Sequence, residues 1–157
     1  MKIKTIFFFV AILFFTNNCG FKVLDKSKNN NFTIKEIRSS GEIRINHKIK
    51  NNILINSKKD SENQMVISLN TKKIKTIKER NIKNEITKYQ ISLISNVEFF
   101  LLDSDIKTKF NKSVIGDYTA GDNYSTSINN EKKVVDDLVE NLSEKIFDEI
   151  VEKINDL

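Results

Sequence analysis

The sequence predicts an α+β domain in which two helices pack on one face of a four-stranded, mostly antiparallel sheet. Residues 86–102 alternate between apolar and polar side chains, which is typical of a strand with one buried face. Residues 135–154 carry apolar side chains at helical spacing. Weaker patterns complete the order strand, helix, three strands, helix, and no internal repeat is visible. We therefore expect a single two-layer domain over residues 32–157.

The expected domain begins with a short strand over residues 32–37, which the run Ser39–Gly41 then breaks. Residues 42–56 are ambiguous. Their isoleucines recur every four residues, as on a helix, but the first two of them alternate, as on a strand. We interpret this segment as a helix, because a clear polar break follows it over residues 56–63.

Three strands follow in the prediction. Residues 64–69 alternate, and the pattern continues to residue 75. Residues 86–102 form the strongest strand signal, and the turn 103–105 leads into a further strand over residues 106–115. A polar loop is expected over residues 116–127. On the strand 86–102, the alternate side chains expected to face the core are Tyr89, Ile91, Leu93, Val97, Phe99 and Leu101.

The chain closes with a predicted amphipathic helix. Asn129 or Asn130 can cap it, and Glu131 falls in its expected first turn. We expect the helix to cover the sheet. A membrane surface is a less favoured partner, because most of its acidic residues lie off the apolar stripe and anionic lipid repels them. The stripe consists of Val135, Leu138, Leu142, Ile146, Ile150 and Ile154.

Charge is distributed unevenly along the chain, whose formal net charge is +5. Residues 32–112 hold 17 basic and 9 acidic residues, whereas residues 113–157 hold 4 basic and 11 acidic ones. A basic body suits an anionic partner such as lipid A phosphate, anionic lipid or nucleic acid. The alternative is that these charges only form a solvated surface.

The N-terminus predicts a lipoprotein signal peptide over residues 1–18. Two early lysines precede the unbroken apolar run 6–15, which is too short to span a bilayer but fits a secretory signal. Cys19 follows this run and is the expected lipidation site, where more than one acyl chain would give stable anchoring. Residues 19–31 are interpreted as a lipidated tether.

Two residues qualify the signal-peptide prediction. Asn17 and Asn18 stand where the usual lipoprotein signal has small residues, so an uncleaved N-terminal anchor is the alternative. Gly20 is not Asp, so the usual inner-membrane retention signal is absent, which favours the outer membrane.

No catalytic, cofactor or metal motif is found, and an enzyme is not expected. The sequence has one Cys and one His. A single Cys excludes an intramolecular disulfide, and one residue of each type argues strongly against a zinc site. His47 is interpreted as a surface or core imidazole. Asp103 and Asp105 could be read as paired carboxylates, but their place in an expected hairpin turn favours a turn role.

A basic stretch covers residues 71–88, with seven basic residues against two acidic ones. On a hairpin, alternate members of this stretch would share a face. Arg can bind a phosphate group through two hydrogen bonds, whereas Lys acts as a point charge. The competing interpretation is a charged hairpin tip that keeps a sheet edge soluble.

Three segments together resemble the lipopolysaccharide-assembly lipoprotein family (LptE/RlpB-like). Cys19-Gly20-Phe21 resembles the start of its mature chains. Arg80-Asn81, then Glu85 and Lys88-Tyr89-Gln90, resembles its central hairpin. Asn130-Glu131 and the helix up to Asn155 resemble its closing helix.

The resemblance implies two helices on a four-stranded sheet, held inside a large outer-membrane β-barrel (LptD-like) that the lipoprotein plugs and helps to assemble. It also implies lipopolysaccharide binding through a basic residue at the hairpin tip. Arg80 matches that residue best, and Lys78 and Lys83 are neighbouring candidates. A second basic site of the family is not matched, since Ile128 falls near it and Lys132 and Lys133 are the closest basic residues.

The alternative function is a free-standing lipid carrier, or a pilotin-type lipoprotein that escorts another outer-membrane complex. A carrier needs an apolar cavity of several hundred Å³. A nucleic-acid partner fits the basic charge but not export, so none is expected.

Overall fold

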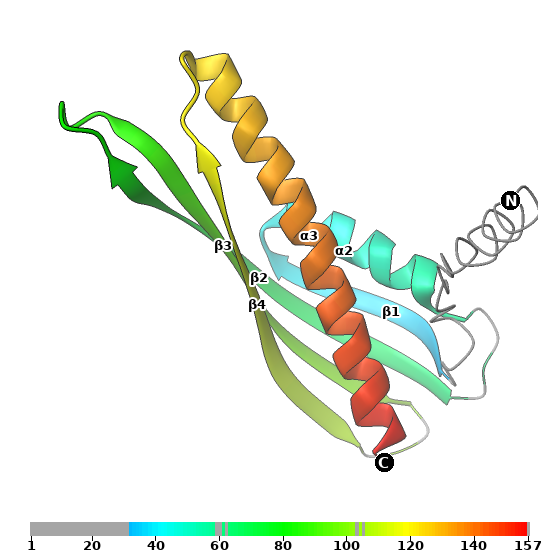
Figure 1. Ribbon diagram of the computed structural model, residues 1–157. Helices are drawn as coiled ribbons and strands as arrows, with labels where there is room; N and C mark the ends of the chain where they lie inside the picture. The colour runs from blue at the N-terminus through cyan, green and yellow to red at the C-terminus, as the bar shows by residue number, and fades with distance from the viewer. Residues whose placement is uncertain (1–31, 59–60, 62, 103, 105, 157) are drawn as a thin grey trace, which may run out of the picture.

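A computed structural model describes residues 32–58, 61, 63–102, 104 and 106–156. The predicted signal peptide, Cys19, the tether, and the turn residues Asp103 and Asp105 lie outside the described residues. Two helices pack on one face of a four-stranded sheet (Figure 1), so the predicted α+β class is confirmed. The elements in chain order are β1 (Phe32–Gly41), α2 (Ile43–Asn56), β2 (Asn63–Arg80), β3 (Ile86–Leu101), β4 (Lys107–Thr119) and α3 (Tyr124–Asn155).

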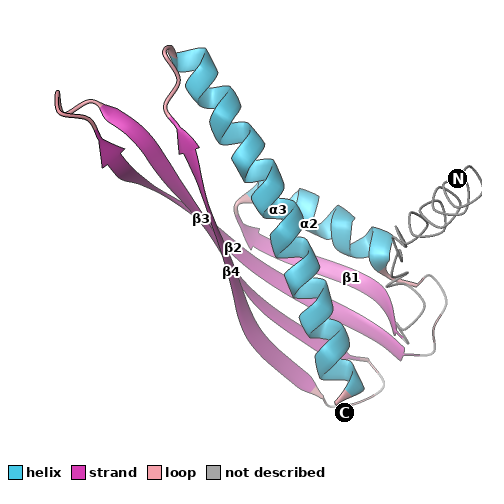
Figure 2. Ribbon diagram, viewed as in Figure 1, coloured by secondary structure: helices cyan, strands magenta, loops and turns pink. Residues whose placement is uncertain are grey.

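The sheet has the strand order β1-β2-β3-β4. The pairs β2-β3 and β3-β4 are antiparallel, whereas β1 pairs with β2 in parallel, so the sheet is mixed and mostly antiparallel, as expected. A parallel pair requires a crossover, because the chain must return to the end of the sheet where the first strand began before the second strand can start. Helix α2 forms this crossover (Figure 2).

The core lies between the helices and one face of the sheet. Side chains of one parity point into it on each central strand, as the alternation on β3 predicted. Leu69 of β2 stands in register with Val97 of β3, and both are almost completely buried. Helix α3 crosses the sheet and also packs along α2. Its buried stripe comprises Leu138, Val139, Leu142, Ser143, Ile146, Phe147 and Ile150.

Segment 43–56 is a helix, as predicted. Ile45, Ile49 and Ile53 recur at one-turn spacing and all are buried, so the four-residue period prevails over the short alternation. Among the described residues, neither helix combines the length and apolar content that crossing a membrane requires.

The predicted break at Ser39–Gly41 is wrong, because β1 continues through it and pairs up to Gly41. The chain turns at Gly41, whose φ of 88° lies in the left-handed region. A Cβ at this position would fall 2.2 Å from the carbonyl oxygen of Thr71, so Gly allows the close contact. The backbone N–H of Glu42 donates to that oxygen at 3.0 Å.

The predicted loop 116–127 is also wrong in its first part, because β4 runs to Thr119. Helix α3 begins at Tyr124, and its N-cap is Asn123, whose Oδ1 accepts from the backbone N–H of Thr126 at 2.8 Å. Asn129 and Asn130 therefore lie inside the helix. The Asn130 amide instead donates to the carbonyl of Thr119 at 3.0 Å.

We expect Leu142→Ala to lower the free energy of unfolding by about 3 kcal/mol, because it removes a fully buried side chain and leaves a cavity. Urea unfolding followed by circular dichroism measures this. Ile82→Ala is the control, since Ile82 is fully exposed at the hairpin tip and its loss should change stability by less than about 0.5 kcal/mol. Equal losses in the two variants would contradict the assigned core.

Candidate functional site: the basic end of the β2-β3 hairpin

The β2-β3 hairpin extends beyond the part of the sheet that α2 covers (Figure 1). Its turn is closed by the side chain of Asn81, whose Oδ1 accepts from the backbone N–H groups of Lys83 at 2.9 Å and Glu85 at 3.0 Å. Asn84 adopts a φ of 65°, which Asn tolerates better than most residues. The turn is therefore ordered by its own hydrogen bonds.

Arg80 and Lys83 lie together at this ordered tip, and both are exposed. Nη1 of Arg80 donates to the carbonyl oxygen of Asn84 at 2.8 Å. This contact uses one of five guanidinium N–H donors and holds the group at the turn. Among the residues that the structure describes, neither Arg80 nor Lys83 has a carboxylate partner.

Lys78 differs from the other two candidates, because its ammonium group pairs with the carboxylate of Asp117 on β4. Gln90 donates to the same carboxylate at 3.1 Å. The Lys78 and Gln90 hydrogen bonds hold the pKa of Asp117 below its usual range. Lys88 is similarly paired with Glu79 at 2.7 Å. The free positive charge of the hairpin end is thus concentrated at Arg80 and Lys83.

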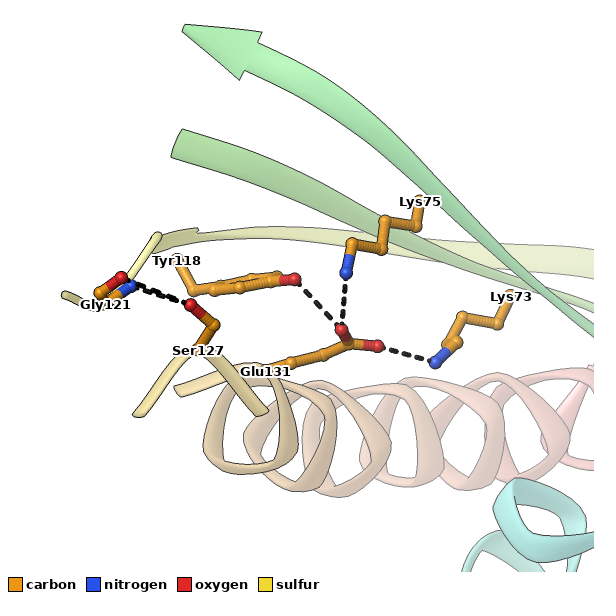
Figure 3. A network of polar contacts seen from close by, with 6 residues as sticks. All are labelled: Lys73, Lys75, Tyr118, Gly121, Ser127 and Glu131. Atoms are coloured by element: carbon orange, nitrogen blue, oxygen red, sulfur yellow. Dashed lines mark hydrogen bonds and ion pairs between the residues drawn. The ribbon is translucent and has the colours of Figure 1, made fainter. Parts of the chain in front are cut away.

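A second cluster of cations lies on the inner face of the hairpin, where the basic stretch meets α3 (Figure 3). The Glu131 carboxylate accepts from Nζ of Lys73 at 2.9 Å, from Nζ of Lys75 at 2.7 Å and from the hydroxyl of Tyr118 at 2.9 Å. Nζ of Lys75 also lies 4.3 Å from the ring centroid of Tyr89, which stacks on Tyr118. We call these five residues the Glu131 cluster.

The protonation of the Glu131 cluster follows from its geometry. Partial burial alone would raise the pKa of Glu131, but hydrogen bonds from Lys75, Lys73 and Tyr118 outweigh burial and lower the pKa to about 2. Burial would also lower the pKa of Lys75, yet its bonds to Glu131 and Tyr118 raise that pKa. Burial raises the pKa of Tyr118. The Glu131 carboxylate and the Lys75 ammonium group are therefore charged throughout the physiological range.

This cluster was not predicted from the sequence, although the sequence contains the signal for it. Lys73 and Lys75 share the parity of Met65, Ile67 and Leu69, whose side chains face the core. That parity predicts that the two lysines point toward the helices. An acidic residue on the facing helix is then the expected partner, and Glu131 fills this role from the second turn of α3.

A groove lies beside the Glu131 cluster, between the start of α2, β2 and α3. Its volume is about 520 Å³, and it opens to solvent. Lys48 pairs with Asp136 across it, whereas Arg44 and Lys132 have no partner among the described residues. Ile128 is 45% exposed at the groove, at the position where the family resemblance leaves a basic site unmatched. The apolar residues that line the groove are Ile45, Ile128, Val135 and Val139.

The described residues contain no cluster of three or more His, Cys, Asp or Glu side chains that could hold a metal. His47 is exposed on α2, and its Nδ1 lies 3.4 Å from the side-chain nitrogen of Asn51. Of the two places considered for this imidazole, surface or core, the structure shows the surface.

No protein-family model and no curated protein matches the sequence. Solved structures that share the fold include three bacterial lipoproteins. Rare lipoprotein B from Shewanella oneidensis has a TM-score of 0.61 and 12% identity, covering 77% of this chain and 97% of that one. A putative lipoprotein from Caulobacter crescentus CB15 has a TM-score of 0.56 and 9% identity, covering 83% and 92%. A lipoprotein B from Nitrosomonas europaea has a TM-score of 0.50 and 10% identity, covering 78% and 83%.

The class of protein that the fold defines is therefore a two-layer α+β domain of the kind found in these bacterial lipoproteins. The expected resemblance to the LptE/RlpB-like family is confirmed at the level of the fold. The likeness covers nearly the full length of the Shewanella structure.

We expect Glu131→Gln to destabilise the protein by about 3 kcal/mol at neutral pH, because a pKa lowered from 4.5 to about 2 corresponds to that energy. The lowered pKa means that this stability is present above pH 4.5 and is lost as pH falls toward 2. Urea unfolding at several pH values measures it. Glu140→Gln, on the exposed side of the same helix, is the control. An identical acid-induced loss in wild type and Glu131→Gln would refute this role.

Proposed function

We propose that this chain is an outer-membrane lipoprotein that assembles with and plugs a large β-barrel translocon and helps to deliver lipopolysaccharide to the cell surface. The observation that carries the proposal is the fold shared with rare lipoprotein B across almost the whole of that structure. The ordered cationic tip formed by Arg80 and Lys83 supplies a place for an anionic ligand.

Anchoring is the first step of the proposed function. The sequence pattern around Cys19 is that of an acylated N-terminus, and two or more acyl chains would hold the chain stably at a membrane. Gly20 after the cysteine supports the outer membrane as the destination. The domain would then stand beside the membrane on the tether formed by residues 19–31.

Plugging is the second step. The lumen of large outer-membrane barrels is polar, so a plug needs a polar exterior over a core of its own. This domain meets both conditions, because the helices bury the apolar face of the sheet and leave the opposite face largely polar. The protein would support the barrel as it folds and then occupy its lumen.

The third step is contact with lipopolysaccharide. Phosphate groups of lipid A are doubly anionic, and a guanidinium group can bind one through two parallel hydrogen bonds. Arg80 keeps donors free for such a contact, Lys83 adds a second charge, and Lys78 lies nearby but is already paired with Asp117. Cations at this tip would weaken the divalent-cation bridges that hold lipopolysaccharide molecules together.

The alternative of a free-standing carrier has less support. A carrier would hold its cargo in an enclosed apolar cavity. The space between helices and sheet is filled by side chains such as Ile49, Phe99 and Ile146, which are fully buried. The groove between α2 and α3 opens to solvent and has charged residues along it. A pilotin-type role differs from the main proposal only in its partner.

Partner identity is tested by purifying a C-terminally tagged full-length chain from outer membranes in mild detergent. We expect one large β-barrel protein to co-purify in equal amount. Recovery of the lipoprotein alone, or with a secretin, would reject the plug and favour the carrier or pilotin. The same experiment on Cys19→Ala should lose the membrane fraction, since that variant cannot be acylated.

Charge reversal at the tip tests the lipopolysaccharide contact. We expect Arg80→Asp to weaken lipopolysaccharide binding about tenfold or more, because each charge-assisted hydrogen bond contributes roughly 1.5–3 kcal/mol. Binding is measured by titrating labelled lipopolysaccharide with purified protein at fixed salt. Lys145→Asp is the matched control, since it makes the same charge change at an exposed position on α3. Equal weakening in both variants would show that only net charge matters.

A further inference from the structure

The sheet face opposite the two helices carries one row of uncharged polar side chains that crosses all four strands. Ser40 of β1 is in register with Asn70 of β2, which pairs with Asn96 of β3, which pairs with Asn111 of β4. All four are exposed, and no described helix covers this face (Figure 2). We call Asn70, Asn96 and Asn111 the amide row.

The amide row has unused hydrogen-bonding capacity. Among the described residues, none makes a hydrogen bond with any of its three side chains. Each carboxamide offers two donors and an acceptor with two lone pairs. The row lines an open hollow of about 500 Å³, to which Ser40 and Ser68 also contribute. This volume lies within the range of small-molecule sites.

The charged side chains that line the hollow are Glu98 and Lys109, one of each sign. Glu98 lies beside the amide row on β3, and its carboxylate is paired with Lys107 and, at 3.6 Å, with Lys109. Arg38 on β1 is paired with Glu36 at 2.9 Å. The lining of the hollow therefore carries no net charge, and its carboxylate is already paired. The site suits an uncharged ligand with many hydrogen-bonding groups.

The spacing of the row limits the shape of the ligand. Neighbouring strands lie about 4.8 Å apart, so the row presents one carboxamide at each such interval, perpendicular to the strands. One sugar ring of an extended (1→4)-linked glycan advances by nearly this length, and its hydroxyl groups can both donate and accept. A peptide strand rises only about 3.3 Å per residue, so its residues would not match the spacing of the carboxamides in the row.

We propose that the amide row binds an extended, uncharged (1→4)-linked oligosaccharide, with one sugar ring over each of Asn70, Asn96 and Asn111. Ser40 extends the same row onto β1 and lengthens the platform by one strand. This site is independent of the cationic hairpin tip, since it lies on the body of the sheet and requires no free charge. The proposed oligosaccharide site can therefore be tested independently of the proposed function.

The experiment is a titration of the ¹⁵N-labelled domain with cellotetraose and with chitotetraose in its fully N-acetylated, uncharged form, followed by nuclear magnetic resonance. The side-chain NH₂ signals of the three asparagines report directly on the site. We expect these signals to shift with one or both ligands at millimolar concentration, while the Asn51 and Asn81 signals, on α2 and at the hairpin tip, stay fixed. Maltotetraose is the ligand control, because its α-linkage curves the chain out of register with the row.

Variants then assign the binding to the amide row. We expect Asn96→Val to weaken binding about fivefold, the loss that one or two hydrogen bonds produce. Ser92→Val is the matched control, because it lies four residues away on the same strand and face and should leave affinity unchanged. Valine has a high propensity for β-strands, so neither substitution should unfold the domain.

The response to the ligands separates the outcomes. A shift with chitotetraose alone would assign the row to acetamido sugars, and a shift with both would assign it to the extended ring geometry. Absence of any shift, shifts of equal size with maltotetraose, or equal affinity of Asn96→Val and wild type would overturn the proposal. Lipopolysaccharide binding and barrel co-purification would be unaffected by that result.

Discussion

Burial of a single face of the sheet under α2 and α3 is the constraint on which the other features depend. The alternation along β3 places its apolar residues on one side, and the two helices supply the only cover available to them among the described elements. The opposite face is left polar by the same alternation, because successive side chains point in opposite directions. One constraint thus produces both a filled core and a free, hydrophilic surface.

The hairpin between β2 and β3 shows what happens where this cover ends. Lys73 and Lys75 occupy core-facing positions, so their charges are directed toward α3 rather than into solvent. A partly buried ammonium group is costly without a counter-ion, and Glu131 compensates two of them with one carboxylate. This pairing ties the hairpin to the helix. The cations beyond it, Arg80 and Lys83, remain free for a ligand.

Three surfaces of the domain consequently have different chemistry. The hairpin tip is cationic and ordered, which suits phosphate. The groove beside Ile128 is partly apolar and opens to solvent. The sheet face around Asn96 is neutral and rich in hydrogen-bonding groups. The two-layer fold with one open face thus provides surfaces of more than one kind.

Patterns of neighbouring residues were enough to predict the strand and helix types and the buried parity of β3, whereas the position of Arg80 at a hairpin tip was implied by the family resemblance. They failed at element ends: the cap is Asn123 rather than Asn129 or Asn130, and β4 continues to Thr119 because it pairs with β3. The partner of Lys78 was not predicted either: Lys78 and Asp117 are 39 residues apart, and only the strand register brings them together. Side-chain periodicity is a local property, whereas the register that aligns the amide row is decided by the packing of whole strands.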